Sequence, residues 1–142
     1  MFEVITNSPA ETELFAEKLA EKLSGGEIIA FKGGMGMGKT CFTRGLAKGL
    51  GFDGQVSSPT FAIVNEYLGG RLPLYHFDMF RVESWEDLYS CGFFDYSETG
   101  GIIAAEWSEN IENALSGNVI TVEIKQLDEN TRKILVSGVE SI

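Results

Sequence analysis

The sequence predicts one α/β domain with a mainly parallel central sheet, antiparallel additions and helices on both faces. Short apolar runs alternate with helix-like stretches over the first half of the chain, an order typical of parallel sheets. Two further pairs of strand-like runs are each separated by a short turn, as in hairpins. The length of 142 residues, 44% of them hydrophobic, suits one core, so we expect residues 1–142 to form a single domain.

The first two predicted elements are a short strand over Phe2–Ile5 and a capped helix. Ser8 begins an S-x-x-E capping box, and Pro9 occupies the first helical position. Apolar residues then recur at helical spacing to about Ser24, where two glycines end the pattern. The spacing predicts a helix with one face in the core.

A glycine-rich loop lies between the next strand and the next helix. Glu27–Phe31 is a short apolar run of the kind buried in parallel sheets. Glycines are frequent from Gly33 to Gly38, and Lys39–Leu50 suits a helix that glycines end. The functional interpretation depends on this order of strand, loop and helix.

The second half of the chain supplies further strands, bounded by glycine and polar turns. They are Phe61–Tyr67, Leu72–Phe77, Gly101–Ala105, Val119–Ile124 and Lys133–Val136. The first two should form an antiparallel hairpin at the edge of the sheet, and the last two are joined by a turn over Asp128–Asn130. Short helices are expected after Ser84 and over Ser108–Leu115.

The glycine-rich loop matches the phosphate-binding motif G-x-x-x-x-G-K-[ST]. Residues Gly33–Thr40 have the sequence G-G-M-G-M-G-K-T in the required strand-to-helix context, which predicts the fold of P-loop nucleoside triphosphatases. The backbone N–H groups would surround the β-phosphate, Lys39 would bridge the β- and γ-phosphates, and the Thr40 hydroxyl would bind Mg²⁺. The alternative is a flexible glycine turn with a solvated lysine.

The segment expected to bind ATP extends into the start of the following helix. Its members are Gly33, Gly34, Met35, Gly36, Met37, Gly38, Lys39, Thr40 and Cys41. Cys41 itself is expected to be a small hydrophobic side chain and not a reactive thiol.

Two carboxylates could complete such a site. Glu106 follows an apolar strand and would project from its carboxyl end, where an acid that binds Mg²⁺ belongs. Asp78 ends another strand and could bind the metal through water or activate the attacking water. A solvated strand-end acid and an Asx turn are the alternatives. His76, two residues before Asp78, would share its face of the strand and could orient that carboxylate or be a half-buried structural residue.

Ser57–Thr60 is a polar, conformationally restricted segment after the loop helix. In this chain position such proteins often carry a switch that senses the γ-phosphate, so Thr60 could bind Mg²⁺ or phosphate. A plain turn explains the same residues.

The charge argues against direct recognition of nucleic acid. With 21 acidic and 11 basic residues the formal net charge is −10, so the surface should repel phosphates and anionic lipid. The alternative is that the acids only keep the protein soluble.

The two cysteines lack metal-site spacing, the start of the chain lacks signal-peptide features, and no apolar run approaches the roughly 18 residues of a membrane span. We therefore expect a cytoplasmic protein without membrane contact.

Four segments in this order resemble a known family over nearly the whole chain. They are the phosphate loop running into Phe42–Gly45, Val56–Phe61, Tyr75–Arg81 and Glu106–Trp107. The chain is thereby similar to the TsaE family, the small ATPases of bacterial tRNA threonylcarbamoyladenosine synthesis. It departs from the family pattern at Gly34, where an acid is usual, and at Phe80, where a tyrosine is usual, and neither change removes a group that phosphate chemistry requires.

The resemblance implies a Mg²⁺-dependent ATPase and assigns roles to individual residues. Those implied at the phosphates, the metal and the hydrolysis step are Lys39, Thr40, Glu106 and Asp78. Those implied in the switch and around the adenosine are Thr60, Ser8, Thr12 and Arg132. The family also implies partners similar to TsaD and TsaB, which carry out the threonylcarbamoyl transfer while ATP hydrolysis resets the complex.

Three other functions are compatible with a phosphate loop. A small GTPase is disfavoured because the chain has no N-K-x-D or D-x-x-G segment. A small-molecule kinase would need an arginine-bearing lid, whereas the arginines here are few and scattered. A nucleotide-gated binding module without significant hydrolysis stays open, although Asp78 and Glu106 together favour hydrolysis.

Overall fold

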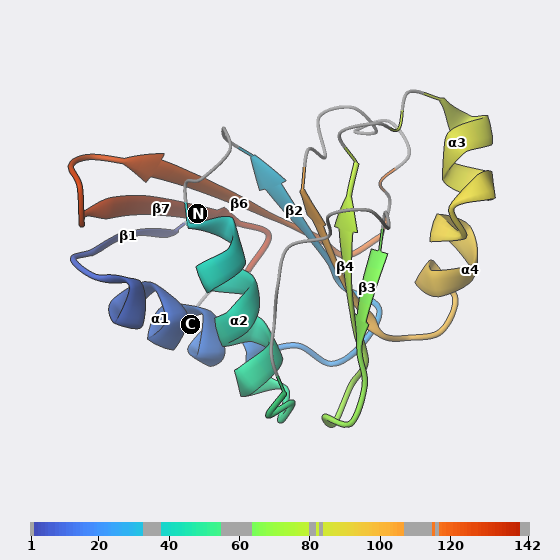
Figure 1. The fold of residues 1–142 in the computed structure, drawn as a ribbon, viewed down its shortest axis with the longest axis horizontal. Helices are drawn as coiled ribbons and strands as arrows, with labels where there is room; N and C mark the ends of the chain where they lie inside the picture. Colours follow the sequence, from blue (N-terminus) through green and yellow to red (C-terminus); the bar gives the residue numbers. More distant parts are fainter. Residues whose placement is uncertain are drawn as a thin grey trace.

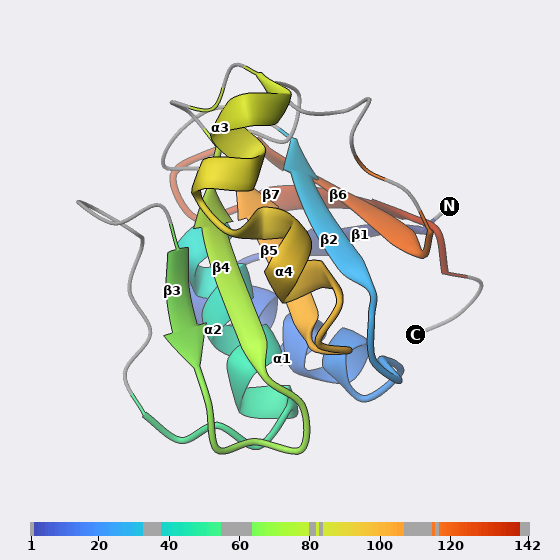
Figure 2. The same ribbon diagram turned by 90° about the vertical axis from the view of Figure 1, so that its right-hand side faces the viewer.

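A computed structural model of the protein describes residues 2–32, 38–54, 64–79, 82, 84–106, 115 and 117–139. These residues form one sheet with helices on both of its faces (Figures 1 and 2). The strands are β1 (Phe2–Thr6), β2 (Ile28–Lys32), β3 (Val64–Tyr67), β4 (Leu74–Asp78), β5 (Ile102–Glu106), β6 (Val119–Gln126) and β7 (Arg132–Ser137). The helices are α1 (Pro9–Ala20), α2 (Lys39–Gly49), α3 (Trp85–Ser90) and α4 (Phe93–Ser97).

The sheet has a parallel centre and antiparallel margins. Its strand order is β1-β7-β6-β2-β5-β4-β3. β2 pairs in parallel with both β5 and β6, and β4 pairs in parallel with β5. β3 pairs with β4, β7 with β6 and β1 with β7, all antiparallel. This confirms the predicted α/β fold with a mainly parallel sheet and antiparallel additions, including the hairpin at one edge.

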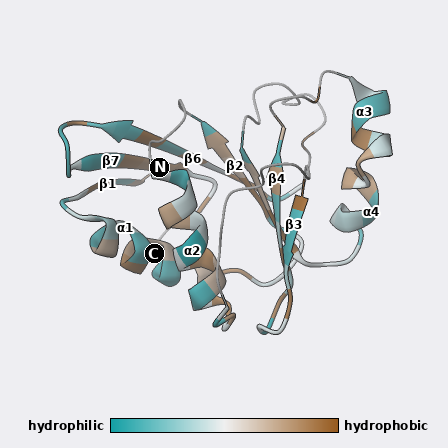
Figure 3. Ribbon diagram, viewed as in Figure 1, coloured by the Kyte–Doolittle hydropathy of each residue, from teal (hydrophilic) through white to brown (hydrophobic). Residues whose placement is uncertain are grey.

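Alternating side chains of the central strands supply two hydrophobic clusters, one on each face of the sheet. Phe31 and Ile102 pack with α1 and α2 through residues such as Phe42. Phe77 and Ile103 belong to the cluster on the opposite face, with α3 and α4. In Figure 2, α3 and α4 lie in front of the sheet and α1 and α2 behind it, and Figure 3 shows both hydrophobic and hydrophilic residues on the helices. Helices therefore cover both faces, as predicted.

The predicted cap of α1 is present, but the helix ends earlier than predicted. Ser8 Oγ accepts a hydrogen bond from the Glu11 N–H at 3.2 Å, and Pro9 is the first helical residue. At the other end, the N–H of Leu23 donates to the Ala20 carbonyl at 3.1 Å, a tighter i to i−3 bond. Leu23 stays buried in this turn, so the apolar spacing continues to about Ser24 although the α-helix ends at Ala20.

Some predicted elements differ from the structure or lie outside its described part. Helix α4, which follows Gly92, was not predicted, because five residues are too few to show a helical period. Residues 61–63 of the predicted edge strand and 108–114 of the predicted helix lie outside the described residues. Within the described ranges, no helix is both long and apolar enough to cross a membrane.

Helices α1 and α2 approach each other closely at two glycines. A Cβ added to Gly45 would lie 2.2 Å from the Glu13 carbonyl oxygen and 2.6 Å from the Ala16 Cβ. A Cβ added to Gly49 would lie 2.6 Å from the Glu17 carbonyl oxygen. Because α1 backbone atoms fill the space that a side chain would need, only glycine fits at these positions without moving a helix.

Candidate functional site

The two candidate acids lie opposite each other at the carboxyl edge of the parallel strands. Asp78, the last residue of β4, is the register partner of Glu106, the last residue of β5. The Met79 N–H continues the pairing by donating to the Glu106 carbonyl at 2.9 Å. β5 in turn pairs with β2, the strand that leads into the glycine-rich loop. Neighbouring strands therefore bring both acids to the edge where that loop begins, which is where ligands of such sheets bind.

Glu106 is held by the single histidine of the chain. His76 Nε2 lies 2.5 Å from Glu106 Oε2, and the Glu106 side chain is only 14% exposed. His76 is fully buried and not half-buried as predicted. The structure therefore corrects the idea that His76 orients Asp78, because its hydrogen bond is to the acid on the neighbouring strand.

Helix α2 begins with the lysine and threonine of the phosphate-binding motif. Gly38 precedes it with a φ of 95°, a left-handed conformation that favours glycine. Lys39 is 3% exposed, and the Thr43 hydroxyl donates to its carbonyl oxygen at 2.9 Å. In the described part of the chain no side chain caps this end of the helix. The start of a helix favours a bound anion, so this end of α2 suits a phosphate.

A small pocket of about 60 Å³ lies beside the start of α2. Three separate segments line it: the start of α1, the start of α2 and the turn between β6 and β7. The lining residues are Ser8, Pro9, Thr12, Gly38, Cys41, Glu129, Asn130 and Arg132. The structure thus brings together the residues assigned to the adenosine and the end of the phosphate loop. Their contact with a nucleotide stays a prediction.

Several pocket residues also hold the surrounding backbone. The hydroxyl oxygens of Thr12 and Thr6 lie 2.6 Å apart in a buried hydrogen bond. Arg132 Nη1 donates to the carbonyls of Asp128 at 3.0 Å and Thr131 at 3.2 Å, which ties its guanidinium to the β6–β7 turn. These bonds connect the pocket wall to β1 and to the β6–β7 turn.

The Cys41 side chain bridges the two helices at this pocket. Its Sγ–H donates to the Pro9 carbonyl at 3.0 Å. Burial raises the pKa of the Cys41 thiol, an effect that the nearby Arg44 guanidinium only partly offsets. A thiol with a raised pKa is a poor nucleophile, in agreement with the expectation that Cys41 is not reactive.

Sequence reasoning missed three lining residues of this pocket. Pro9 was identified only as the first residue of a helix, and Glu129 and Asn130 only as part of a turn. The turn itself was correctly placed, but nothing local in the sequence indicates that it faces the start of α1.

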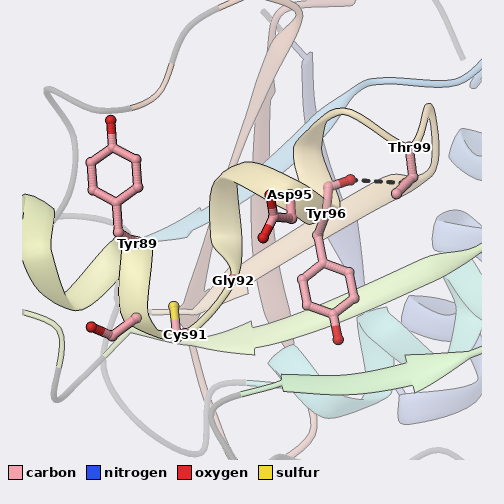
Figure 4. Close-up of a pocket in the computed structure, with 7 residues that line it drawn as sticks. Tyr89, Cys91, Gly92, Asp95, Tyr96 and Thr99 are labelled. Carbon is pink, nitrogen blue, oxygen red and sulfur yellow. Dashed lines mark hydrogen bonds between the residues drawn. The ribbon is translucent and has the colours of Figure 1, made fainter.

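A second, larger hollow lies on the opposite face of the sheet. It has a volume of about 460 Å³ and is lined by residues of α3 and α4 and the turns around them, among them Tyr89, Asp95 and Tyr96 (Figure 4). None of the predicted site residues lines it, so we do not place the nucleotide there.

The remaining predicted residues lie outside the described part of the chain. They are Gly33, Gly34, Met35, Gly36, Met37 and Thr60. Their proposed contacts with phosphate and Mg²⁺ stay predictions.

The described residues offer oxygen ligands for a metal that arrives with a nucleotide. Within them there is no group of three or more His, Cys, Asp or Glu side chains that could hold a metal ion. Thr40, Asp78 and Glu106 offer a hydroxyl and carboxylates, which are the hard oxygen ligands that Mg²⁺ prefers. Mg²⁺ is commonly bound by one or two carboxylates together with substrate phosphates and water, so this sparse donor set fits Mg²⁺ bound to ATP.

Comparison with known proteins identifies the family. The model of the threonylcarbamoyl adenosine biosynthesis protein TsaE matches residues 6–134. The tRNA threonylcarbamoyladenosine biosynthesis protein TsaE of Bacillus subtilis is 38% identical over 135 residues, covering 94% of this chain and 84% of that protein. The TsaE of Aquifex aeolicus is 41% identical over 138 residues, covering 94% of both chains.

A solved structure agrees with the sequence matches. The crystal structure of Bacillus subtilis YdiB superposes with a TM-score of 0.78 and 31% sequence identity, covering 97% of this chain and 86% of that one. By its sequence, the chain belongs to the TsaE family of tRNA threonylcarbamoyladenosine biosynthesis proteins.

Proposed function

We propose that the protein is a Mg²⁺-dependent ATPase that supports threonylcarbamoyladenosine formation in tRNA. The observation that carries the proposal is the placement of Asp78 and Glu106 as register partners at the carboxyl edge of β4 and β5, next to the strand that leads into the phosphate loop. A simple nucleotide-binding module requires the loop but not this pair of acids.

Each proposed site residue would have a separate role in phosphoanhydride hydrolysis. Lys39 and the N–H groups at the start of α2 would bind the β- and γ-phosphates, and Thr40 and Glu106 would hold Mg²⁺. When bound, Mg²⁺ would neutralise the charge that develops on the transferring phosphoryl group. Asp78 or Glu106 would position the attacking water in line with the bond that breaks.

The pocket beside α2 marks where the adenosine would contact the protein, although its volume of about 60 Å³ holds only part of a nucleoside. Ser8 and Thr12 would form one wall and Arg132 the other, and Gly38 joins this pocket to the phosphate loop. At Gly38 a side chain would be strained because of the positive φ. The nucleotide would thus lie across the starts of α1 and α2.

The partners are proposed to be proteins similar to TsaD and TsaB, met in the cytoplasm, and not RNA. The formal net charge of −10 opposes binding to a polyanion. ATP hydrolysis by this subunit would then act on the protein complex that modifies the tRNA, and hydrolysis should be slow without it.

The test is Mg²⁺-dependent ATP hydrolysis by the purified protein, alone and with the TsaD-like and TsaB-like proteins of the same organism. We expect turnover that rises with the partners. Lys39→Ala should weaken ATP binding about 10- to 100-fold, because hydrogen bonds to charged groups contribute about 1.5–3 kcal/mol. Lys48→Ala is the matched control, because Lys48 lies on the same helix with its side chain 63% exposed.

Glu106→Gln distinguishes hydrolysis from simple binding. It should abolish turnover while partner binding persists. ATP binding without turnover in the wild type, with or without partners, would favour a nucleotide-gated module, and transfer of the γ-phosphate to a hydroxyl compound would favour a kinase.

A further inference from the structure

His76 has a defined hydrogen bond, but the proposed mechanism gives it no role. It lies in the middle of β4, fully buried, and the only hydrogen bond of its side chain among the described residues is to Glu106. Polar side chains so completely buried are uncommon unless a specific partner holds them. The question is what this contact does for Glu106.

The pairing of β4 with β5 explains why His76 reaches Glu106. The register partner of His76 on β5 is Ala104, which has a small side chain. Glu106 is two residues further along β5 and therefore on the same face of the sheet. Diagonal neighbours of this kind lie within reach of long side chains. The histidine thus contacts the last residue of the adjacent strand, at the edge where the proposed site lies.

The surroundings of the imidazole favour a proton on Nε2 over a proton on Nδ1. His76 Nε2 lies 2.5 Å from Glu106 Oε2, and a carboxylate oxygen accepts a hydrogen bond from an imidazole N–H. Nδ1 is buried, and it has no hydrogen-bond partner within the described residues. A proton on Nδ1 in place of Nε2 would bury an unsatisfied N–H and remove the donor to Glu106, at a cost of about 1–3 kcal/mol for the unsatisfied group.

We propose that His76 is a positioning residue that donates its Nε2–H to Glu106 and orients this carboxylate for the divalent cation bound with the nucleotide. A glutamate has freely rotating side-chain bonds, and a hydrogen bond from a ring that packing holds in place removes much of that freedom. The role of His76 toward the cation rests on the proposed function. The hydrogen bond to Glu106 and the tautomer of the imidazole do not depend on that function.

Two substitutions separate the donor from the bulk of the ring. In glutamine the amide nitrogen lies about as far along the side chain as histidine Nε2, and in asparagine it lies near the position of Nδ1. His76→Gln should therefore keep a donor to Glu106, and His76→Asn should lose it. Both variants place an amide in the same buried position of β4.

The first measurement is Mn²⁺ affinity, followed by electron paramagnetic resonance, with and without a non-hydrolysable ATP analogue. With the analogue, we expect His76→Asn to lower Mn²⁺ affinity about 10- to 100-fold, the usual effect of removing a hydrogen bond that orients a metal ligand. His76→Gln should restore most of it, and thermal unfolding of both variants reports their stability. Equal losses in both folded variants, or no loss in His76→Asn, would overturn the proposal.

The second measurement needs no variant. Because the chain has one histidine, the ¹⁵N spectrum of labelled wild-type protein contains one imidazole. We expect a protonated Nε2 and a bare Nδ1, and the opposite tautomer would overturn the proposal even if His76→Asn fails to fold. If the wild type binds Mn²⁺ no better with the analogue than without it, the proposed function fails. The role of His76 toward the cation then fails as well. The tautomer then still decides whether His76 orients Glu106.

Discussion

Gly45 offers the most direct test of how α1 and α2 are packed. In an exposed helix interior, a change from glycine to alanine stabilises a protein by about 1 kcal/mol. Here the added Cβ would lie 2.2 Å from a backbone oxygen of α1, which cannot move aside by a change of rotamer. Restoring an ordinary contact requires the helices to separate by about 1 Å, and overpacking of this kind costs about 1–3 kcal/mol.

Gly45→Ala should therefore be destabilising, because the clash with a backbone atom exceeds the gain in helix propensity. We expect a net loss of about 1–2 kcal/mol, which lowers Tm by roughly 2–8 °C. Urea and thermal unfolding followed by circular dichroism measure it, with Lys48→Ala as the control, because this change removes only an exposed ion pair with Glu13 of α1 and adds no atom between the helices. A Gly45→Ala protein that is more stable than the wild type would refute the close approach of the two helices.

Two further predictions concern single ionisable groups. Hydrogen bonds from the N–H groups of Asn130 and Thr131 hold the pKa of Asp128 below its ordinary value. These hydrogen bonds therefore stabilise the fold at any pH above the ordinary pKa of an aspartate. The stabilisation is lost as the pH falls through the lowered pKa of Asp128. Asp128→Ala should thus lower the urea midpoint at pH 7, and the difference from the wild type should shrink below about pH 3.9; a constant difference down to pH 2 would contradict this. Burial raises the pKa of the Cys41 thiol, so its alkylation by iodoacetamide, followed by mass spectrometry, should be slower at pH 7.5 than that of free cysteine and should accelerate above about pH 9. Alkylation at the rate of free cysteine would contradict a raised pKa of this thiol.

Short sequence patterns correctly predicted the helix and strand ends that depend on neighbouring residues. The cap formed by Ser8 and Pro9 marks the start of α1 because its hydrogen bond spans only three residues. The change from an apolar run to a glycine loop similarly marks the end of β2 and the start of α2. Such contacts depend on neighbouring residues, so the sequence alone contains the information that defines them.

Contacts between distant segments could not be predicted in the same way. The partner of His76 depends on the register of β4 against β5, and a shift of that register would bring a different residue opposite the ring. Glu129 and Asn130 join the pocket only because their turn folds against the start of α1. The resemblance to a family supplied Ser8, Thr12 and Arg132 as members of one site, which spacing along the chain does not indicate.

The pairing of β1 with β7 has a consequence for the order in which the protein is completed during synthesis. Phe2 lies opposite Val136 in this pair, so nearly the whole chain separates two strands that are neighbours in the sheet. The small pocket beside α2 is also built from distant parts of the chain, because Arg132 lines one wall and Ser8 lines the other. Contacts with such long sequence separation form late in folding, and a chain emerging from the ribosome can build the phosphate-loop helix well before it can close this pocket. A fragment that ends before β6 would thus carry every residue assigned to phosphate and metal and still lack one side of the proposed adenosine site.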